Sequence, residues 1–203
     1  MNIAIIGASG SAGSRIVSEA LARGHQVTGI ARHADKIASR DDLRVAAGDV
    51  AQPGALAELL AGHDVVVSAV RFQGFDLEDL LEALRRAHVP RLVMVGGAGS
   101  LRTASGGLWL DAPPFPEEVK GEARAGAEKL KALRAQRDID WTFLSPSALF
   151  EPGERTGRYR VGSEELLTDA NGESRISQED YAIALLDEVE SPRHRRERFT
   201  VGY

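Results

Sequence analysis

The sequence predicts an α/β protein whose doubly wound parallel sheet carries helices on both faces. Three observations support this fold class. Short strands that are apolar on both faces alternate with helical segments, as in buried parallel sheets. The first of these strands leads directly into a turn with regularly spaced glycines and then into a helix. The 203 residues, 43% of them hydrophobic, fit a single domain spanning 1–203.

The chain opens on a strand followed by a helix. Residues 2–6 form a short apolar run rich in isoleucine, which is typical of a buried strand. In the segment 14–23, the apolar residues at positions 16, 17, 20 and 21 share one helical face. Gly24 then provides a helix stop.

The remaining elements continue this alternation. Strands are expected at 26–31, 43–49, 64–70 and 91–95, and helices at 54–61 and 76–88, the second of them capped by Asp76. A helix over 117–136 and a strand over 140–144 follow. Further on we expect a hairpin of 164–169 and 173–177 around Asn171-Gly172, a helix opened by the capping-box pattern of 177–180, and a closing strand over 198–201. The segments 97–116 and 145–162 remain irregular, and we expect them to be binding loops.

Three glycines at a spacing of three follow the first strand. Gly7 permits a tight exit from the strand, Gly10 lets the backbone approach a pyrophosphate, and Gly13 lets the helix pack closely on the sheet, as in a Rossmann-like fold. The free N–H groups and the positive dipole end of the helix would then hold the anion. The candidate phosphate-binding residues are Gly7, Ser9, Gly10, Ser11, Ala12 and Gly13. A tight strand-to-helix turn without a ligand is the alternative.

The end of the second strand predicts which dinucleotide is bound. NAD-selective sites place a carboxylate there to bind the ribose 2′-hydroxyl, whereas this chain has Arg32 between an alanine and a histidine. An arginine can form charged hydrogen bonds with a 2′-phosphate, so NADP(H) is favoured over NAD(H), with Arg15 and Lys36 as additional candidate cations. The alternative is that Arg32 is a solvated loop cation without a partner.

Residues after the next three strands complete the predicted cofactor site. Asp49 and Val50 follow the third strand, where an aspartate can accept a hydrogen bond from the adenine amino group, although Asp49 could equally cap a turn. Ala69 and Val70 end the fourth strand and would let the dinucleotide lie flat. Gly97, after the fifth strand, would border the reacting face.

Composition excludes several functional classes. The chain has no cysteine, which excludes thiolate catalysis and cysteine-ligated metals, and its five histidines show no metal-binding spacing. A net charge of −5 argues against nucleic acid as a partner. No apolar run approaches the roughly 20 residues that span a bilayer. We therefore expect a cytoplasmic protein without a membrane partner, either a monomer or a homodimer.

The glycine motif, Arg32 and the element order together resemble the atypical short-chain dehydrogenase/reductase superfamily. The segments 144–162 and 176–182 are further similar to the NADH-flavin reductase family, which is related to biliverdin reductase B and to NmrA-like proteins. The resemblance covers essentially the whole chain. It implies a reduced nicotinamide cofactor held by residues 7–13 and Arg32. It also implies a small-molecule acceptor, a flavin or a quinone, placed over the nicotinamide by the loops 97–116 and 145–162.

One motif of the superfamily is absent. Enzymes that act on alcohols and ketones use Tyr-x-x-x-Lys, in which the lysine lowers the pKa of the tyrosine so that it can exchange a proton with the substrate. Neither Tyr159 nor Tyr181 has a lysine four residues later, and Lys120 has Pro116 four residues before it. A flavin or quinone needs less help from a placed acid, because the charge brought by the hydride delocalises over a conjugated ring.

Two functions remain open. The first is an NAD(P)H-dependent oxidoreductase, with NADPH favoured, that passes hydride to a quinone or to a flavin bound as substrate rather than as prosthetic group. The second is an NmrA-like redox sensor that binds NADP(H) without turnover. The missing tyrosine disfavours a third, an epimerase or dehydratase. Candidates for the reacting face are Ser145, Ser147 and Lys120, and aromatic residues that could stack on an acceptor or anchor the loops are Trp109, Phe115 and Phe150.

Overall fold

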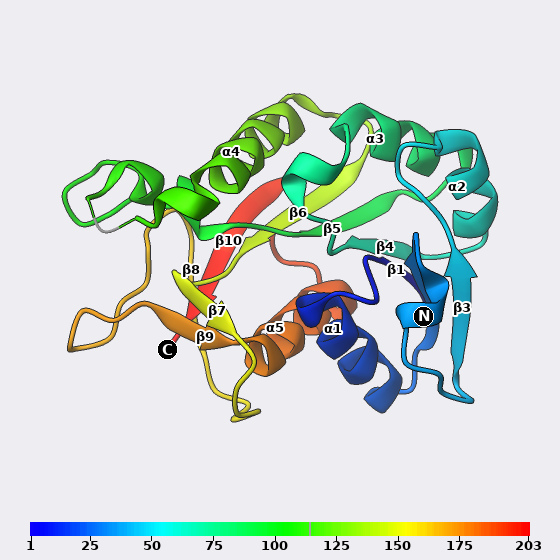
Figure 1. Cartoon of the computed structure of the whole chain (residues 1–203), viewed down its shortest axis with the longest axis horizontal. Coiled ribbons are helices and arrows are strands. Elements are labelled where there is room, and N and C mark those ends of the chain that lie inside the picture. The colour runs from blue at the N-terminus through cyan, green and yellow to red at the C-terminus, as the bar shows by residue number, and fades with distance from the viewer. Residues whose placement is uncertain (114) are drawn as a thin grey trace.

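The computed structural model describes residues 1–113 and 115–203 and is built around one large sheet with helices on both sides (Figure 1). The strands are β1 (Asn2–Ile6), β2 (Gln26–Ala31), β3 (Leu43–Ala47), β4 (Val65–Ser68), β5 (Arg91–Val95), β6 (Asp140–Ser145), β7 (Leu149–Glu151), β8 (Arg160–Gly162), β9 (Arg175–Ser177) and β10 (Glu197–Gly202). The α-helices are α1 (Ser11–Ala22), α2 (Pro53–Leu60), α3 (Leu77–Arg86), α4 (Lys120–Ala135) and α5 (Gln178–Glu190).

The strand order confirms the predicted doubly wound fold. The large sheet has the order β3-β2-β1-β4-β5-β6-β10-β8, and its ladders are parallel except for the edge strand β8, which runs antiparallel to β10. The chain starts at β1, winds outward to β3, and then returns to β4 on the other side of β1. The carboxyl ends of β1 and β4 therefore form the switch point at which such sheets bind ligands.

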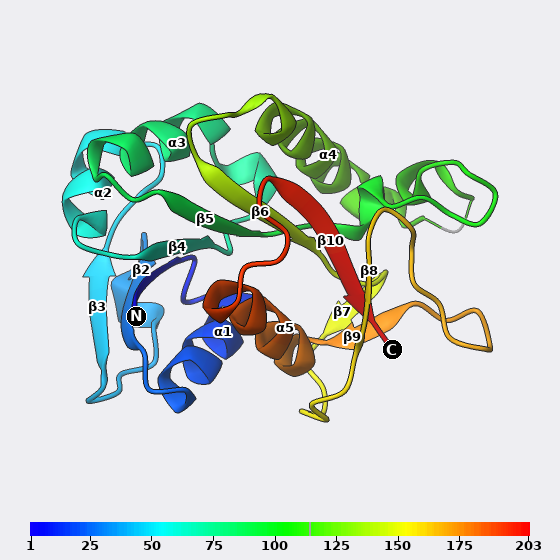
Figure 2. The ribbon, with the colours of Figure 1, turned by 180° about the vertical axis from the view of Figure 1, so that it is seen from behind.

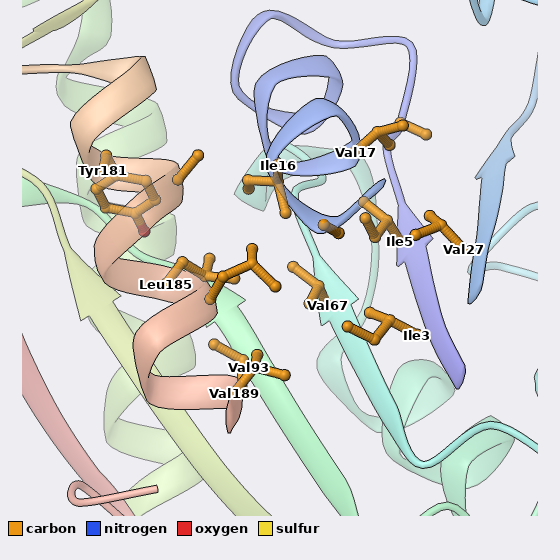
Figure 3. Packing of buried hydrophobic residues seen from close by; sticks show 14 of the residues in the cluster. Ile3, Ile5, Ile16, Val17, Val27, Val67, Val93, Tyr181, Leu185 and Val189 are labelled. Carbon is orange, nitrogen blue, oxygen red and sulfur yellow. The ribbon is translucent and has the colours of Figure 1, made fainter. Parts of the chain in front are cut away.

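Each face of the sheet has its own hydrophobic core. Helices α1 and α5 cover one face, and α2, α3 and α4 cover the other (Figures 1 and 2). On the α1 and α5 face, Ile16 and Leu185 pack toward Val67 of β4 (Figure 3). On the opposite face, Leu81 of α3 and Trp141 of β6 belong to the second cluster. Burial on both faces explains why the strand sequences lack polar alternation.

The C-terminal third corrects two predictions. The expected hairpin of 164–169 and 173–177 is wrong, because β9 pairs in parallel with β7 instead. The turn itself is present, since Gly172 has φ +83° and donates a backbone hydrogen bond to the carbonyl of Asp169 at 3.0 Å. The segment 145–162 is also less irregular than predicted, since it contains β7 and β8. Pairings between strands far apart in the sequence leave no local signal.

The described helices also bear on membrane association. Within residues 1–113 and 115–203, no helix is both long enough and apolar enough to cross a membrane.

A buried acid fixes α5 on the sheet. The Glu188 carboxylate accepts hydrogen bonds from Arg91 of β5 at 2.9 Å and from the backbone N–H groups of Arg193 and His194 at 3.1 and 3.0 Å, and Nδ1 of His194 lies 2.8 Å away. Burial alone would raise the pKa of the Glu188 carboxyl. The hydrogen bonds from His194 and Arg193 outweigh this effect and hold the pKa below its ordinary value.

Replacing Glu188 with glutamine should lower the free energy of unfolding by ~3 kcal/mol at neutral pH, because Arg91 stays buried with only part of its counter-charge. Since the pKa of Glu188 is lower in the folded state, this carboxylate stabilises the fold above its unfolded pKa of about 4.3 and less as the pH falls through the folded value. Denaturant unfolding should show that Glu188→Gln lowers the free energy of unfolding less at acid pH than at neutral pH. The exposed Glu58→Gln is the matched control, and a loss independent of pH would contradict this role.

Candidate functional site

The exit of β1 lies directly against the exit of β4. Gly7 has φ +86°, and a Cβ on it would lie 2.6 Å from the carbonyl oxygen of Ala69. Its N–H donates to the carbonyl of Ile30 in β2 at 2.8 Å. Only glycine allows this turn, so the predicted role of Gly7 as a tight exit is consistent with the geometry.

The start of α1 packs closely on the same turn. A Cβ on Gly13 would lie 2.1 Å from the carbonyl oxygen of Gly7, which no side chain tolerates. Gly10 is different, because its Cβ would meet only that same oxygen, at 3.2 Å, and its backbone angles suit any residue. The packing of the protein therefore requires glycine less strictly at position 10 than at positions 7 and 13, and the predicted approach of a pyrophosphate to the backbone there would account for it.

The first turn of α1 presents unpaired backbone donors. Gly10 is the N-cap and no side chain in the described chain caps this helix. The N–H groups of Ser11, Ala12 and Gly13 occupy the first three helical positions, where no carbonyl within the helix is available to them. Together with the positive end of the helix dipole, these N–H groups form a candidate anion-binding site.

Helix α5 holds this first turn in place. The Ser11 hydroxyl donates to the side-chain oxygen of Gln178 at 2.6 Å, and Arg15 pairs with Glu179 at 2.9 Å. Arg15 is thus paired with α5, and its role as a cation for the 2′-phosphate stays a prediction. The position of the glycine turn depends on residues that lie more than 160 positions away in the sequence.

A groove of about 530 Å³ runs past this turn at the carboxyl ends of the strands. It brings together eight of the predicted cofactor residues and five neighbours. The lining residues are Ile6, Gly7, Ser9, Gly10, Arg32, Gly48, Asp49, Val50, Ala69, Val70, Arg71, Gln73 and Gly74. The other predicted residues lie beside it, with Ser11, Ala12 and Gly13 in the adjoining helical turn and Gly97 in a second cavity.

The two polar residues predicted to select the nucleotide both line this groove. Arg32 is exposed, and its guanidinium makes no ion pair with residues 1–113 or 115–203. Lys36 lies outside the lining, on an exposed turn. Asp49 caps a turn, because one carboxylate oxygen accepts the N–H of Ala51 at 3.1 Å. The residue also lines the groove, and its contact with the adenine stays a prediction.

A second cavity, of about 560 Å³, adjoins the groove at residues 69–71. Its wall is formed by the ends of β4 and β5, the loop 97–116, the start of α4 and residues 146–150, and most of it is apolar. Trp109 and Phe115 contact each other edge to face with ring centroids 5.9 Å apart, and Phe150 packs on Tyr181 at 4.7 Å. Phe150 therefore anchors its loop to the core, Trp109 and Phe115 pack on each other within their loop, and all three residues line the cavity.

Only the first part of the predicted second loop reaches this cavity. Residues 151–158 instead cross α1 and α5, where Arg155 forms two hydrogen bonds of 3.0 Å with Glu19. Further along this segment, Gly157 N–H donates to the buried Asp180 at 2.8 Å. Of the segment 145–162, which we expected to bind the acceptor, only 146–150 line the cavity, and 151–158 hold two helices together.

None of the three predicted catalytic candidates offers a free acid to the cavity. Ser145 is fully buried beside Arg198 and does not line it. Ser147 does line it, but its hydroxyl donates to the carbonyl of Val201 at 3.0 Å. Lys120 pairs with Glu117 at 2.9 Å and lies outside the lining.

Tyr159 and Tyr181 do not supply a proton donor to the cavity either. Burial raises the pKa of Tyr181, whose hydroxyl donates to the carbonyl of Leu144 at 2.6 Å inside the core. Burial and the neighbouring Asp187 carboxylate raise the pKa of Tyr159, which lies outside both cavities. The missing Tyr-x-x-x-Lys motif is therefore not restored by the fold.

Two charged residues of the cavity were given no role from the sequence. Arg71 lies where the cavity and the groove meet, and Glu122 of α4 faces the same wall. The Glu122 carboxylate accepts hydrogen bonds from the backbone N–H groups of Phe72 and Gln73, the second at 3.1 Å. Arg71 directly follows the fourth predicted strand, so the strand-end rule points to it. No local sequence pattern marks Glu122 as a cavity residue, because only the packing of α4 against the sheet brings it to this wall.

Comparison with known proteins agrees with this geometry. Residues 7–192 match a family described as NAD(P)H-binding. The uncharacterized protein YwnB of Bacillus subtilis (strain 168) is 44% identical over 211 aligned positions, which cover 99% of this chain and 98% of that protein.

Two solved structures are also similar. One is a protein of Bacteroides thetaiotaomicron provisionally named an epimerase, with a TM-score of 0.93 and 41% identity, covering 100% of this chain and 96% of that one. The other is a protein of Streptococcus pneumoniae TIGR4 provisionally named an NADH-flavin reductase. It has a TM-score of 0.80 and 35% identity, and the match covers 100% of this chain and 99% of that one. Because the family match spans nearly the whole chain and includes the glycine turn of residues 7–13, this chain belongs to the NAD(P)H-binding family of Rossmann-like proteins.

Proposed function

We propose that this protein is an NADPH-dependent oxidoreductase that passes hydride to a flavin or to a similar conjugated acceptor such as a quinone. The observation that carries the proposal is the junction at residues 69–71, where the polar groove opens into the apolar cavity of about 560 Å³. A dinucleotide lying in the groove would bring its nicotinamide to this junction, and the cavity has room for a ring system beside it.

The groove fits the dinucleotide at three points. The N–H groups at the start of α1 would hold the pyrophosphate, and the bare backbone at Gly10 leaves room for it. Arg32 would bind the 2′-phosphate, which distinguishes NADPH from NADH. Asp49 and Val50 would border the adenine. When bound, the reduced nicotinamide supplies the hydride.

The lack of a placed acid supports a conjugated acceptor. In the described part of the chain, no tyrosine or lysine faces the cavity, and the hydroxyl of Ser147 is engaged inside the protein. A ketone would need such a donor for its developing alkoxide. A flavin or quinone spreads the charge and can take its proton from water. The same lack disfavours epimerase chemistry, whatever the provisional name of the Bacteroides relative. The flavin-reductase name of the Streptococcus protein agrees with our proposal.

A redox sensor that binds NADP(H) without turnover is the second candidate. The same observation favours it, since a protein without a catalytic acid can bind the cofactor and signal through a partner. We propose a cytoplasmic location for either function, because the reduced cofactor is available there.

Replacing Gly10 with aspartate should separate the binding role of the turn from its structural role. Aspartate is a favoured N-cap and the backbone angles of Gly10 suit it, which offsets the 3.2 Å approach of its Cβ to the Gly7 carbonyl oxygen, so the melting temperature should change little. The new carboxylate would repel the pyrophosphate, and the affinity for NADPH should fall by about tenfold or more. Thermal melts and calorimetric titration measure the two effects. Gly10→Ser, an uncharged N-cap, should lose less affinity, and undiminished binding by Gly10→Asp would refute the site.

Replacing Arg32 with alanine should weaken NADPH binding by about 1.5–3 kcal/mol, the magnitude of a hydrogen bond to a charged group, and leave NADH binding almost unchanged. The measurement is the Kd of each dinucleotide by titration. Arg44→Ala removes the same charge from an exposed site outside the groove and serves as the control. An equal loss for both dinucleotides would contradict the role of Arg32.

Turnover distinguishes the reductase from the sensor. With NADPH in excess, the purified protein should oxidise NADPH in the presence of riboflavin or a naphthoquinone. The reaction is monitored by the loss of NADPH absorbance. A protein that binds NADPH tightly and oxidises it with neither acceptor would support the sensor instead.

A further inference from the structure

The charged groups of the acceptor cavity are few and nearly balanced. Among the described residues that line it, only Arg71 and Glu122 carry charge, and their charges cancel. Arg71 is also shared with the groove, so a phosphate-bearing cofactor competes for it. The cavity therefore offers an acceptor no net positive charge of its own.

The carboxylate and hydroxyl side chains of the cavity are already engaged. Glu122 accepts the backbone N–H groups of residues 72 and 73, and the hydroxyl of Ser147 donates to the carbonyl of Val201. The hydroxyl of Ser174 accepts the N–H of Ala148 at 3.1 Å. Apart from Arg71 at the junction with the groove and the indole of Trp109, the wall that remains for an acceptor consists of glycine, aliphatic and aromatic groups, which bind by shape and by burial of apolar surface.

A phosphate would be poorly placed in this cavity. It carries a charge of about −1.5 to −2 at neutral pH, and burial of an anion without a partner is costly. The Glu122 carboxylate on the same wall adds repulsion, because two anions in a partly buried site interact strongly. An uncharged planar ring meets neither penalty.

We propose that the acceptor is an uncharged, phosphate-free conjugated dicarbonyl ring, such as a quinone or an unphosphorylated isoalloxazine, and that Glu122 selects against anionic acceptors. This inference rests on the proposed reductase function. The acceptor takes a hydride from the dihydronicotinamide and a proton from water, which converts a quinone to the hydroquinone while the cofactor is oxidised. Glu122 acts by its charge and takes no part in the proton transfer.

Riboflavin and FMN form the matched pair that tests this selectivity, because they differ only by the phosphate and share one fluorophore. The protein is saturated with NADP⁺, which cannot donate hydride, and binding is followed by quenching of flavin fluorescence. We expect the Kd of FMN to exceed that of riboflavin by about tenfold or more. With NADPH, the kcat/KM values of a naphthoquinone and riboflavin should both exceed that of FMN.

The role of Glu122 is tested by Glu122→Gln, which removes the charge and keeps an oxygen that can accept a backbone hydrogen bond. The ratio of the FMN and riboflavin Kd values should narrow by about threefold or more. Glu118→Gln removes the same charge from an exposed position outside the lining and should leave the ratio as in the wild type. Because the wild-type ratio alone tests the selectivity, a Glu122→Gln chain that fails to fold does not rescue the proposal.

The outcomes separate the two proposals. If FMN binds and turns over as well as riboflavin, the selectivity is refuted and the reductase function stands. If NADPH binds but no acceptor is bound or reduced, both proposals fall. A ratio that is unchanged in Glu122→Gln refutes the role of that carboxylate.

Discussion

The contact between the first turn of α1 and the exit of β1 is the constraint on which this structure depends. Gly13 lies on the carbonyl of Gly7, and Gly7 in turn lies on the carbonyl of Ala69 at the end of β4. A side chain at either glycine would push the helix away from the switch point. The unpaired N–H groups of the helix are useful for binding an anion only because this packing places them beside the ends of two parallel strands.

The C-terminal part of the chain stabilises that arrangement from one side. Helix α5 holds α1 through Ser11 and Arg15, and the segment 151–158 adds a paired contact between Arg155 and Glu19. The same region that resembles a family signature in the sequence thus has a structural task in the fold. Glu188, at the other end of α5, anchors the helix to the sheet through Arg91.

The two halves of the candidate site differ in physical character. The groove offers backbone donors and an exposed arginine, which suit phosphates. The adjoining cavity is mostly apolar, and its carboxylate and hydroxyl side chains are engaged within the protein. In the function that we propose, such a site would favour reaction by holding two rings close together rather than by proton transfer from a side chain. An acceptor that delocalises charge would match these walls best.

The sequence by itself determined the alternation of strands and helices, the glycine turn and the cation at Arg32, because each is recorded in local periodicity or spacing. The predicted strands 2–6, 26–31 and 91–95 coincide with β1, β2 and β5. Only the tertiary structure decided what the loops do. It buried Ser145, diverted 151–158 onto the helices, paired β7 with β9 and brought Glu122 to the cavity. These outcomes depend on contacts between residues distant in the chain, whose packing leaves no pattern in neighbouring positions.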